Sequence, residues 1–208
     1  VGSEMCIRDS QWAMLNNELY SGVTIHVINQ GIDAGPVLSF SKVKILVADT
    51  GFTLFIKLVQ LGSELIAQLL PKILKQGFDF ATPQDFSKRN FFLKNKRIDG
   101  KISFNQKASC VQRFIQALNY RPVISPLGHS FIEAPLCIIE PIRVSVSTGS
   151  LAPPSMPGTI LKIDSECMSI ACMDKSIQIK KFWFENKLID AVEGAAVSGM
   201  RPGQVLES

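Results

Sequence analysis

Apolar residues recur at the spacing of an α-helix over one long segment of the chain. From Thr53 onward, leucines fall every three or four residues, and charged or amide side chains occupy other positions. Asp49 and Thr50 precede this run as N-cap candidates, and Gly77 follows it as a stop signal. We therefore predict a helix over residues 53–76, in which Pro71 is a candidate kink. Its apolar face consists of Leu54, Leu58, Leu61, Leu65 and Leu69.

The residues before this helix predict three shorter elements. Residues 11–19 carry apolar side chains at helical spacing and predict a short helix. Residues 22–28 are rich in β-branched side chains and predict a strand. The segment "NQGIDAGP" that follows combines glycines, an asparagine and a proline, which is typical of a turn. Residues 37–47 are then extended, so the first part of the chain has an α/β pattern.

The later part of the chain changes to short apolar runs separated by Gly, Pro and Ser. An amphipathic helix is predicted over residues 108–118. Short strands at close spacing follow and predict a small barrel or sandwich. They lie in the segments 128–134, 135–146, 158–164, 167–173 and 176–184. The pattern indicates two domains, at residues 11–80 and 107–208, joined by a basic linker at residues 81–106.

Composition agrees with a folded, mildly basic protein. The chain has 208 residues, 46% of them hydrophobic, and a formal net charge of +4. Polar and charged residues interrupt the most apolar run, so we expect no membrane span. Five cysteines without a CxxC pair indicate free thiols in a reducing compartment, the cytoplasm or a mitochondrial matrix. Residues 1–10 share no pattern with the rest, and we interpret them as a non-native leader.

One histidine and one aspartate lie where the predicted strand meets the glycine-rich turn. His26 is on the strand and Asp33 is on the turn. If the chain doubles back there, both side chains face one cleft, and a carboxylate beside an imidazole can relay a proton. The alternative is that His26 is an ordinary strand residue and Asp33 an ordinary turn residue.

The order of residues around this pair resembles the second half of the formyltransferase catalytic domain. In that family a Thr-x-His strand is followed, seven residues after the histidine, by the aspartate of an Asp-x-Gly turn. Thr24, His26, Asp33 and Gly35 match this pattern. The upstream "WAMLNNELYSG" is similar to the family's lead-in, although Asn17 stands where a glycine is usual. Downstream, "DGKISF", "RFIQALNYRP", "PGTIL" and "IQIKKF" are similar to the family's C-terminal domain.

The resemblance implies a fold, a cosubstrate and roles for residues. It implies a partial, truncated parallel-sheet domain followed by a small open β-barrel. Members transfer a formyl group from 10-formyltetrahydrofolate to a primary amine, without a metal. Asp33 would organise proton transfer, and His26 would support it. Backbone around the turn would border the folate, and the residues concerned are Gly31, Ile32, Ala34 and Gly35.

The chain departs from the family in one respect. The family's other two catalytic groups form an Asn-x-His motif upstream of this strand, and no Asn-x-His occurs in this sequence. We therefore expect an N-terminally truncated chain that is inactive alone, because one catalytic group does not replace the missing oxyanion donors.

Basic residues point to an anionic acceptor. We predict weak contacts with nucleic acid or substrate at Lys88, Arg89, Lys94, Lys96, Arg97 and Arg121. The first choice of acceptor is initiator methionyl-tRNA, which suits the net positive charge and the appended β-rich domain. The close alternative is a nucleotide-linked amino sugar. Two further alternatives are a non-catalytic RNA- or protein-binding module and a folate-dependent hydrolase. The C-terminal β-rich domain argues against the hydrolase, because the hydrolysis of a small substrate does not require such a domain.

Overall fold

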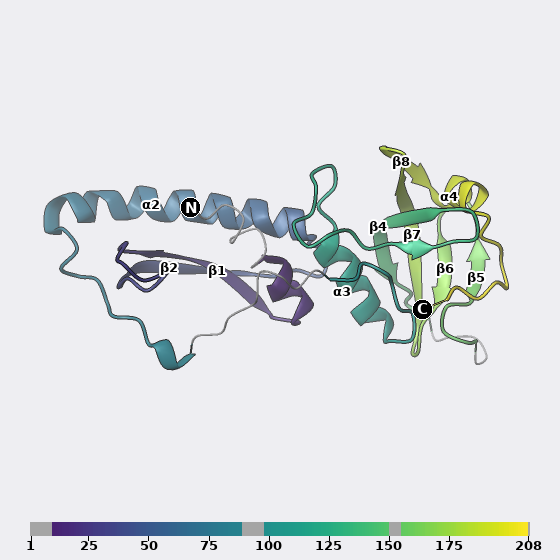
Figure 1. The fold of residues 1–208 in the computed structure, drawn as a ribbon, viewed down its shortest axis with the longest axis horizontal. Coiled ribbons are helices and arrows are strands. Elements are labelled where there is room, and N and C mark those ends of the chain that lie inside the picture. Colours follow the sequence, from purple (N-terminus) through teal and green to yellow (C-terminus); the bar gives the residue numbers. More distant parts are fainter. Residues whose placement is uncertain (1–9, 89–97, 150–154, 208) are drawn as a thin grey trace. The chain divides into compact units, whose positions relative to one another are not determined.

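The computed structural model describes residues 10–88, 98–149 and 155–207. It divides the chain into two compact units, residues 1–96 and residues 97–208. Each unit has its own sheet, and Figure 1 shows the order of the elements along the chain. The predicted class, an α/β part followed by a β-rich part, is confirmed.

The first unit is built on a pair of strands. After a helical turn at residues 10–15, β1 (Tyr20–His26) pairs antiparallel with β2 (Val37–Lys44). The sequence resemblance implied a parallel sheet, but this pair is antiparallel because the short connection over residues 27–36 cannot carry a parallel crossover. Side chains alternate between a face that meets α2 and a face exposed to solvent.

The predicted long helix is α2 (Gly51–Gln76), which runs along one face of the β1–β2 pair (Figure 1). Thr50 is its N-cap: the Thr50 hydroxyl accepts from the N–H of Thr53 at 3.1 Å, and the Thr53 hydroxyl accepts from the N–H of Thr50 at 2.8 Å. This reciprocal capping box explains why the helix starts before Thr53. Gly77 ends the helix with a positive φ of 61°, as predicted, and Pro71 lies inside it. Four of the five predicted core leucines are buried, namely Leu54, Leu58, Leu65 and Leu69.

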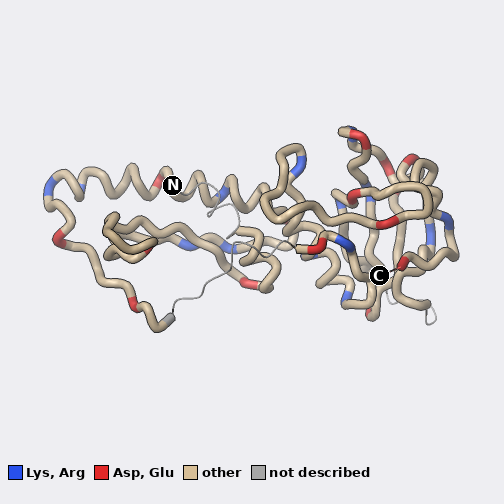
Figure 2. The backbone as a smooth tube through the Cα atoms, in the orientation of Figure 1, with Lys and Arg blue, Asp and Glu red and all other residues tan. Residues whose placement is uncertain are grey.

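The side of α2 that faces away from the strands is also apolar. It exposes Ile56, Val59, Ile66, Leu70 and Leu74, and Figure 2 shows few charges along the helix. By length and composition alone, α2 could cross a membrane. One such helix is weak evidence for a span, and the leucine face that packs on β1 and β2 gives α2 another role.

The second unit is an antiparallel sheet with two helices packed on it. The predicted helix is α3 (Ala108–Leu118), with the predicted bounds. The strands follow the order β3-β4-β7-β6-β5, and β8 pairs with β7. Their bounds are β3 (Ile132–Glu133), β4 (Ile138–Val146), β5 (Ile160–Ile163), β6 (Met168–Ala171), β7 (Ser176–Phe184) and β8 (Lys187–Asp190), and α4 (Ala191–Ser198) follows. Every predicted strand segment contains or overlaps one of these strands.

The core of the second unit lies between the sheet and its helices. Ile115 of α3 and Ile139, Ile177 and Phe182 of the sheet are fully buried. Alternating inward apolar residues on each strand produce this core. The β8–α4 segment was not predicted, because β8 has only four residues and α4 consists mostly of small apolar residues without a clear polar face.

Candidate active site at the end of strand β1

The predicted histidine is the last residue of β1. His26 pairs with Val37 after an irregularity in the strand register at Ile25. Its Nδ1 lies 3.0 Å from the carbonyl oxygen of Val27. A carbonyl oxygen only accepts, so Nδ1 carries the proton and Nε2 of the neutral ring has a free lone pair. The His26 side chain is 25% exposed at the end of the strand.

The structure brings the predicted aspartate to this lone pair. Asp33 Oδ1 lies 3.7 Å from His26 Nε2, and the Asp33 side chain is 56% exposed. The distance is longer than a direct hydrogen bond. With a neutral ring both groups are acceptors, so a water or an amine N–H between them would satisfy both. A pair of acceptors of this kind can receive and pass on a proton.

The turn has a strained residue and a tightly packed one. Asp33 has a φ of 49°, in the left-handed region that costs a non-glycine residue about 1 kcal/mol. Gly35 is buried against the strand it returns to: a Cβ on Gly35 would lie 1.5 Å from the carbonyl oxygen of Val27 and 3.3 Å from His26 Nδ1. The N–H of Val27 donates to the carbonyl oxygen of Pro36 at 2.9 Å, which closes the turn. Only glycine fits at position 35.

The other residues predicted to border folate lie on the same turn. Gly31 and Ile32 are exposed, and Ala34 is half-buried. The N–H of Gly31 donates to the Asn29 side chain at 3.1 Å. Their contact with folate stays a prediction.

One residue of the site was missed by sequence reasoning. The side-chain Nε2 of Gln84 donates to the carbonyl oxygen of Asp33 at 3.0 Å and to that of Gly35 at 2.5 Å. Gln84 lies in "TPQD", which the sequence pattern assigned to the linker. No periodicity could have linked two residues 51 positions apart; a glutamine beside a proline in an otherwise featureless segment was the only local signal.

Of the predicted basic residues, Lys88 and Arg121 lie in the described part of the chain. Lys88 ends the short helix η1 (Phe86–Lys88). The prediction for Arg89, Lys94, Lys96 and Arg97 lies outside the described residues. Arg121 belongs to the second unit, and its phosphate contact likewise stays a prediction.

The guanidinium of Arg121 is held by neighbours in the second unit. It forms a bidentate ion pair with Glu140: Nε donates to Oε2 at 2.9 Å, and Nη2 donates to Oε1 at 2.6 Å. It also lies over the ring of Trp183, 5.1 Å from the centroid. These contacts give Arg121 a structural role in joining the segment after α3 to β4 and β7.

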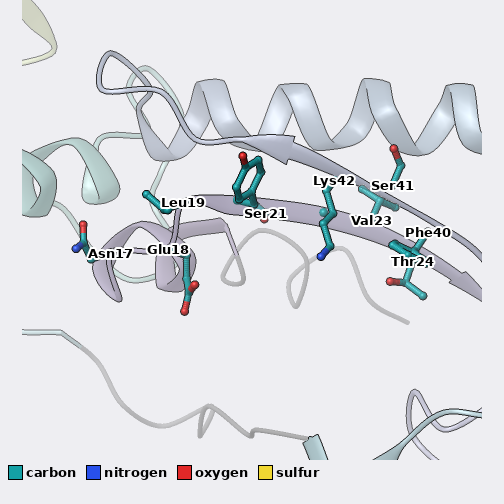
Figure 3. A pocket seen from close by; sticks show the side chains of 11 residues that line it. Asn17, Glu18, Leu19, Ser21, Val23, Thr24, Phe40, Ser41 and Lys42 are labelled. Atoms are coloured by element: carbon teal, nitrogen blue, oxygen red, sulfur yellow. The ribbon is translucent and has the colours of Figure 1, made fainter.

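Two open grooves accompany the strand pair, and neither contains His26 or Asp33. The larger, about 610 Å³, is lined by residues 17–24 and 40–42. Figure 3 shows Lys42 and Thr24 pointing into it, away from α2. The second, about 580 Å³, is lined by residues 37–40 and 82–85, and so includes Gln84. Within residues 10–88, 98–149 and 155–207, no three His, Cys, Asp or Glu side chains could hold a metal ion together.

Comparison with known proteins identifies the second unit. Residues 94–196 match the model of the formyl transferase C-terminal domain. This chain belongs to the formyltransferase family. The methionyl-tRNA formyltransferase of Lachnospira eligens is 27% identical over 178 residues, which is 85% of this chain and 55% of the relative. The bifunctional polymyxin resistance protein ArnA of Wigglesworthia glossinidia brevipalpis is 32% identical over 169 residues, 81% of this chain and 24% of the relative. This formyltransferase chain thus spans about half of the first relative and a quarter of the second.

Solved structures support the same fold for this formyltransferase chain. HypX from Aquifex aeolicus, in complex with tetrahydrofolic acid, has a TM-score of 0.67 and 16% identity over 93% of this chain and 33% of HypX. The sugar 3N-formyl transferase WlaRD, in the presence of dTDP and 5-N-formyl-THF, has a TM-score of 0.62 and 21% identity. The match covers 82% of this chain and 58% of WlaRD. At these identities the likeness concerns the fold.

Proposed function

We propose that the whole protein transfers a formyl group from 10-formyltetrahydrofolate to a primary amine. The observation that carries the proposal is the meeting of Asp33 and His26 at the end of β1, 3.7 Å apart, in a chain of the formyltransferase family. The proposal is supported by HypX, solved in complex with tetrahydrofolic acid, and by WlaRD, solved in the presence of 5-N-formyl-THF.

Formyl transfer requires a proton to move from the attacking amine to the leaving folate nitrogen. The amine nitrogen attacks the formyl carbon, the new C–N bond forms, and the tetrahedral intermediate collapses as the bond to the folate nitrogen breaks. One proton leaves the amine and one reaches the folate nitrogen. The Asp33 carboxylate receives the amine proton and returns it to the leaving nitrogen. His26 Nε2, which faces Asp33, orients the water or amine between them.

The amine that we place first is the methionyl group of initiator methionyl-tRNA. The name of the Lachnospira relative, the net charge of +4 and the cluster of lysines and arginines after Lys88 support it. A nucleotide-linked amino sugar is the second candidate, favoured by the fold shared with WlaRD. Charge supports tRNA more than the sugar nucleotide, because tRNA offers many more phosphates to the basic residues.

The test is an acceptor assay on the whole protein. With 10-formyltetrahydrofolate, initiator methionyl-tRNA and a dTDP-amino sugar are offered separately, and tRNA binding is followed over a salt titration. We expect formylation of tRNA, and Asp33→Asn should lower kcat by about 10²–10⁴-fold. Asp79→Asn, on an exposed turn, is the control. Full activity of Asp33→Asn would refute the role of Asp33, and formylation of the sugar alone would replace the first acceptor by the second.

A further inference from the structure

Gln84 reaches across the unit to the turn that carries Asp33. Its side-chain NH₂ group has two hydrogens, and two backbone carbonyls accept from it, those of Asp33 and Gly35. The donor therefore matches its acceptors in number. These carbonyls lie on either side of Ala34, so one side chain holds both ends of the Asp-x-Gly step.

Gln84 is itself fixed by the strand that leaves the turn. The N–H of Val37 donates to the carbonyl oxygen of Thr82 at 2.7 Å, and the N–H of Thr82 donates back to the carbonyl oxygen of Val37 at 2.8 Å. This bridge places residues 82–84 beside the first residue of β2. The Gln84 amide is therefore anchored to the same strand pair that positions His26.

The turn needs such a restraint because its conformation is unfavourable by itself. Asp33 has a φ of 49°, and its side chain is more than half exposed, so few packing contacts hold it in place. A strained residue persists when its surroundings over-determine it. The 3.7 Å separation between Asp33 and His26 depends on that backbone conformation.

We propose that Gln84 is a positioning residue for the Asp33 carboxylate. It clamps the carbonyls of Asp33 and Gly35 and so keeps the carboxylate facing His26 Nε2. This role rests on the proposed formyl transfer. Gln84 does not touch the reacting atoms; it acts through the backbone of the turn.

The test compares Gln84→Glu with Gln68→Glu in the whole protein. The first substitution keeps the side-chain length but replaces the donating NH₂ by a carboxylate, which repels both carbonyls. The second makes the same change at an exposed position of α2 and serves as the matched control. Two quantities are measured: kcat and KM for formyl transfer, and the ¹⁵N order parameters of the Asp33 and Gly35 amides.

For Gln84→Glu we expect kcat to fall about 10–100-fold, the loss expected when a proton-transfer group is misplaced, with KM for the acceptor within about twofold. The order parameters of Asp33 and Gly35 should fall from about 0.85 toward 0.6. Gln68→Glu should change neither. Unchanged order parameters in Gln84→Glu, or a loosened turn with unchanged kcat, would overturn the proposal.

The two proposals fail in different ways. If the wild-type protein forms no formylated amine with either acceptor, the proposed function fails. The order parameters then test only whether Gln84 holds the turn in place. Lower order parameters in Gln84→Glu support this positioning role, and unchanged order parameters refute it.

Discussion

Two glycine-to-alanine substitutions in the first unit should change stability in opposite directions. Gly35 lies in the turn that carries Asp33, where an added Cβ would stand 1.5 Å from the carbonyl oxygen of Val27. Gly62 lies inside α2, where an added Cβ would meet Val23 Cγ1 at 3.4 Å, an ordinary contact. Neither glycine has a positive φ, so the local space decides the outcome.

The cost of Gly35→Ala follows from the contacts that it breaks. To reach van der Waals separation, the new methyl group must move about 1.5–2 Å away from the Val27 oxygen. That shift opposes the hydrogen bond from Val27 N–H to the Pro36 oxygen and the one from Gln84 to the Gly35 oxygen. Overpacking of about 1–3 kcal/mol and about 0.5–1.5 kcal/mol for each of the two hydrogen bonds give a loss of about 2–6 kcal/mol.

Gly62→Ala should stabilise the same unit. Alanine in a helix interior is favoured over glycine by about 0.5–1 kcal/mol, because it restricts the unfolded chain. The two substitutions therefore differ by about 2.5–7 kcal/mol in the free energy of unfolding, the sum of these two ranges.

The assay is urea unfolding followed by tryptophan fluorescence in a Trp183→Phe background. Trp12 then reports on the first unit, because these are the two tryptophans of the chain. A shift in the midpoint at constant slope measures the change in stability. The steric argument would be refuted if Gly35→Ala unfolded within about 0.5 kcal/mol of the parent, the scatter of ordinary surface substitutions.

Three further predictions concern other sites. Burial lowers the pKa of His129 from its usual 6.5, and its Nε2 accepts from the N–H of Ser125 at 3.2 Å, so protonation favours the unfolded chain. The free energy of unfolding should therefore fall as pH drops through about 6.5, and urea titrations at pH 7.5 and 5.5 should show a smaller fall for His129→Gln. Burial raises the pKa of the Cys172 thiol to about 12. Iodoacetamide at pH 8 should therefore label the exposed Cys110 and leave Cys172 unmodified until urea unfolds the protein. Equal labelling of both cysteines in the folded protein would contradict this prediction. Thr50→Ala removes the N-cap of α2 and should lower the free energy of unfolding by about 1 kcal/mol, measured by circular dichroism in urea. An unchanged free energy of unfolding would contradict this prediction.

Local pattern was sufficient for the elements whose residues repeat at a clear period. The leucines of α2 recur at helical spacing, and four of the five lie in the core. Residues 108–118 form α3 with the predicted bounds, and the alternating strands of the second unit appear where they were expected. Such elements depend on hydrogen bonds between near neighbours and on one buried face, which the order of residues alone encodes.

The sequence by itself also determined the spacing between His26 and Asp33, and with it the resemblance to formyltransferases. Only the tertiary structure decided that His26 Nε2 faces the carboxylate at 3.7 Å, that Asp33 takes a left-handed conformation, and that Gln84 holds the turn from 51 residues away. These features arise from hydrogen bonds and steric contacts between segments that are distant in the chain. A periodic pattern carries no information about such contacts, because their partners meet only once the strand pair has formed.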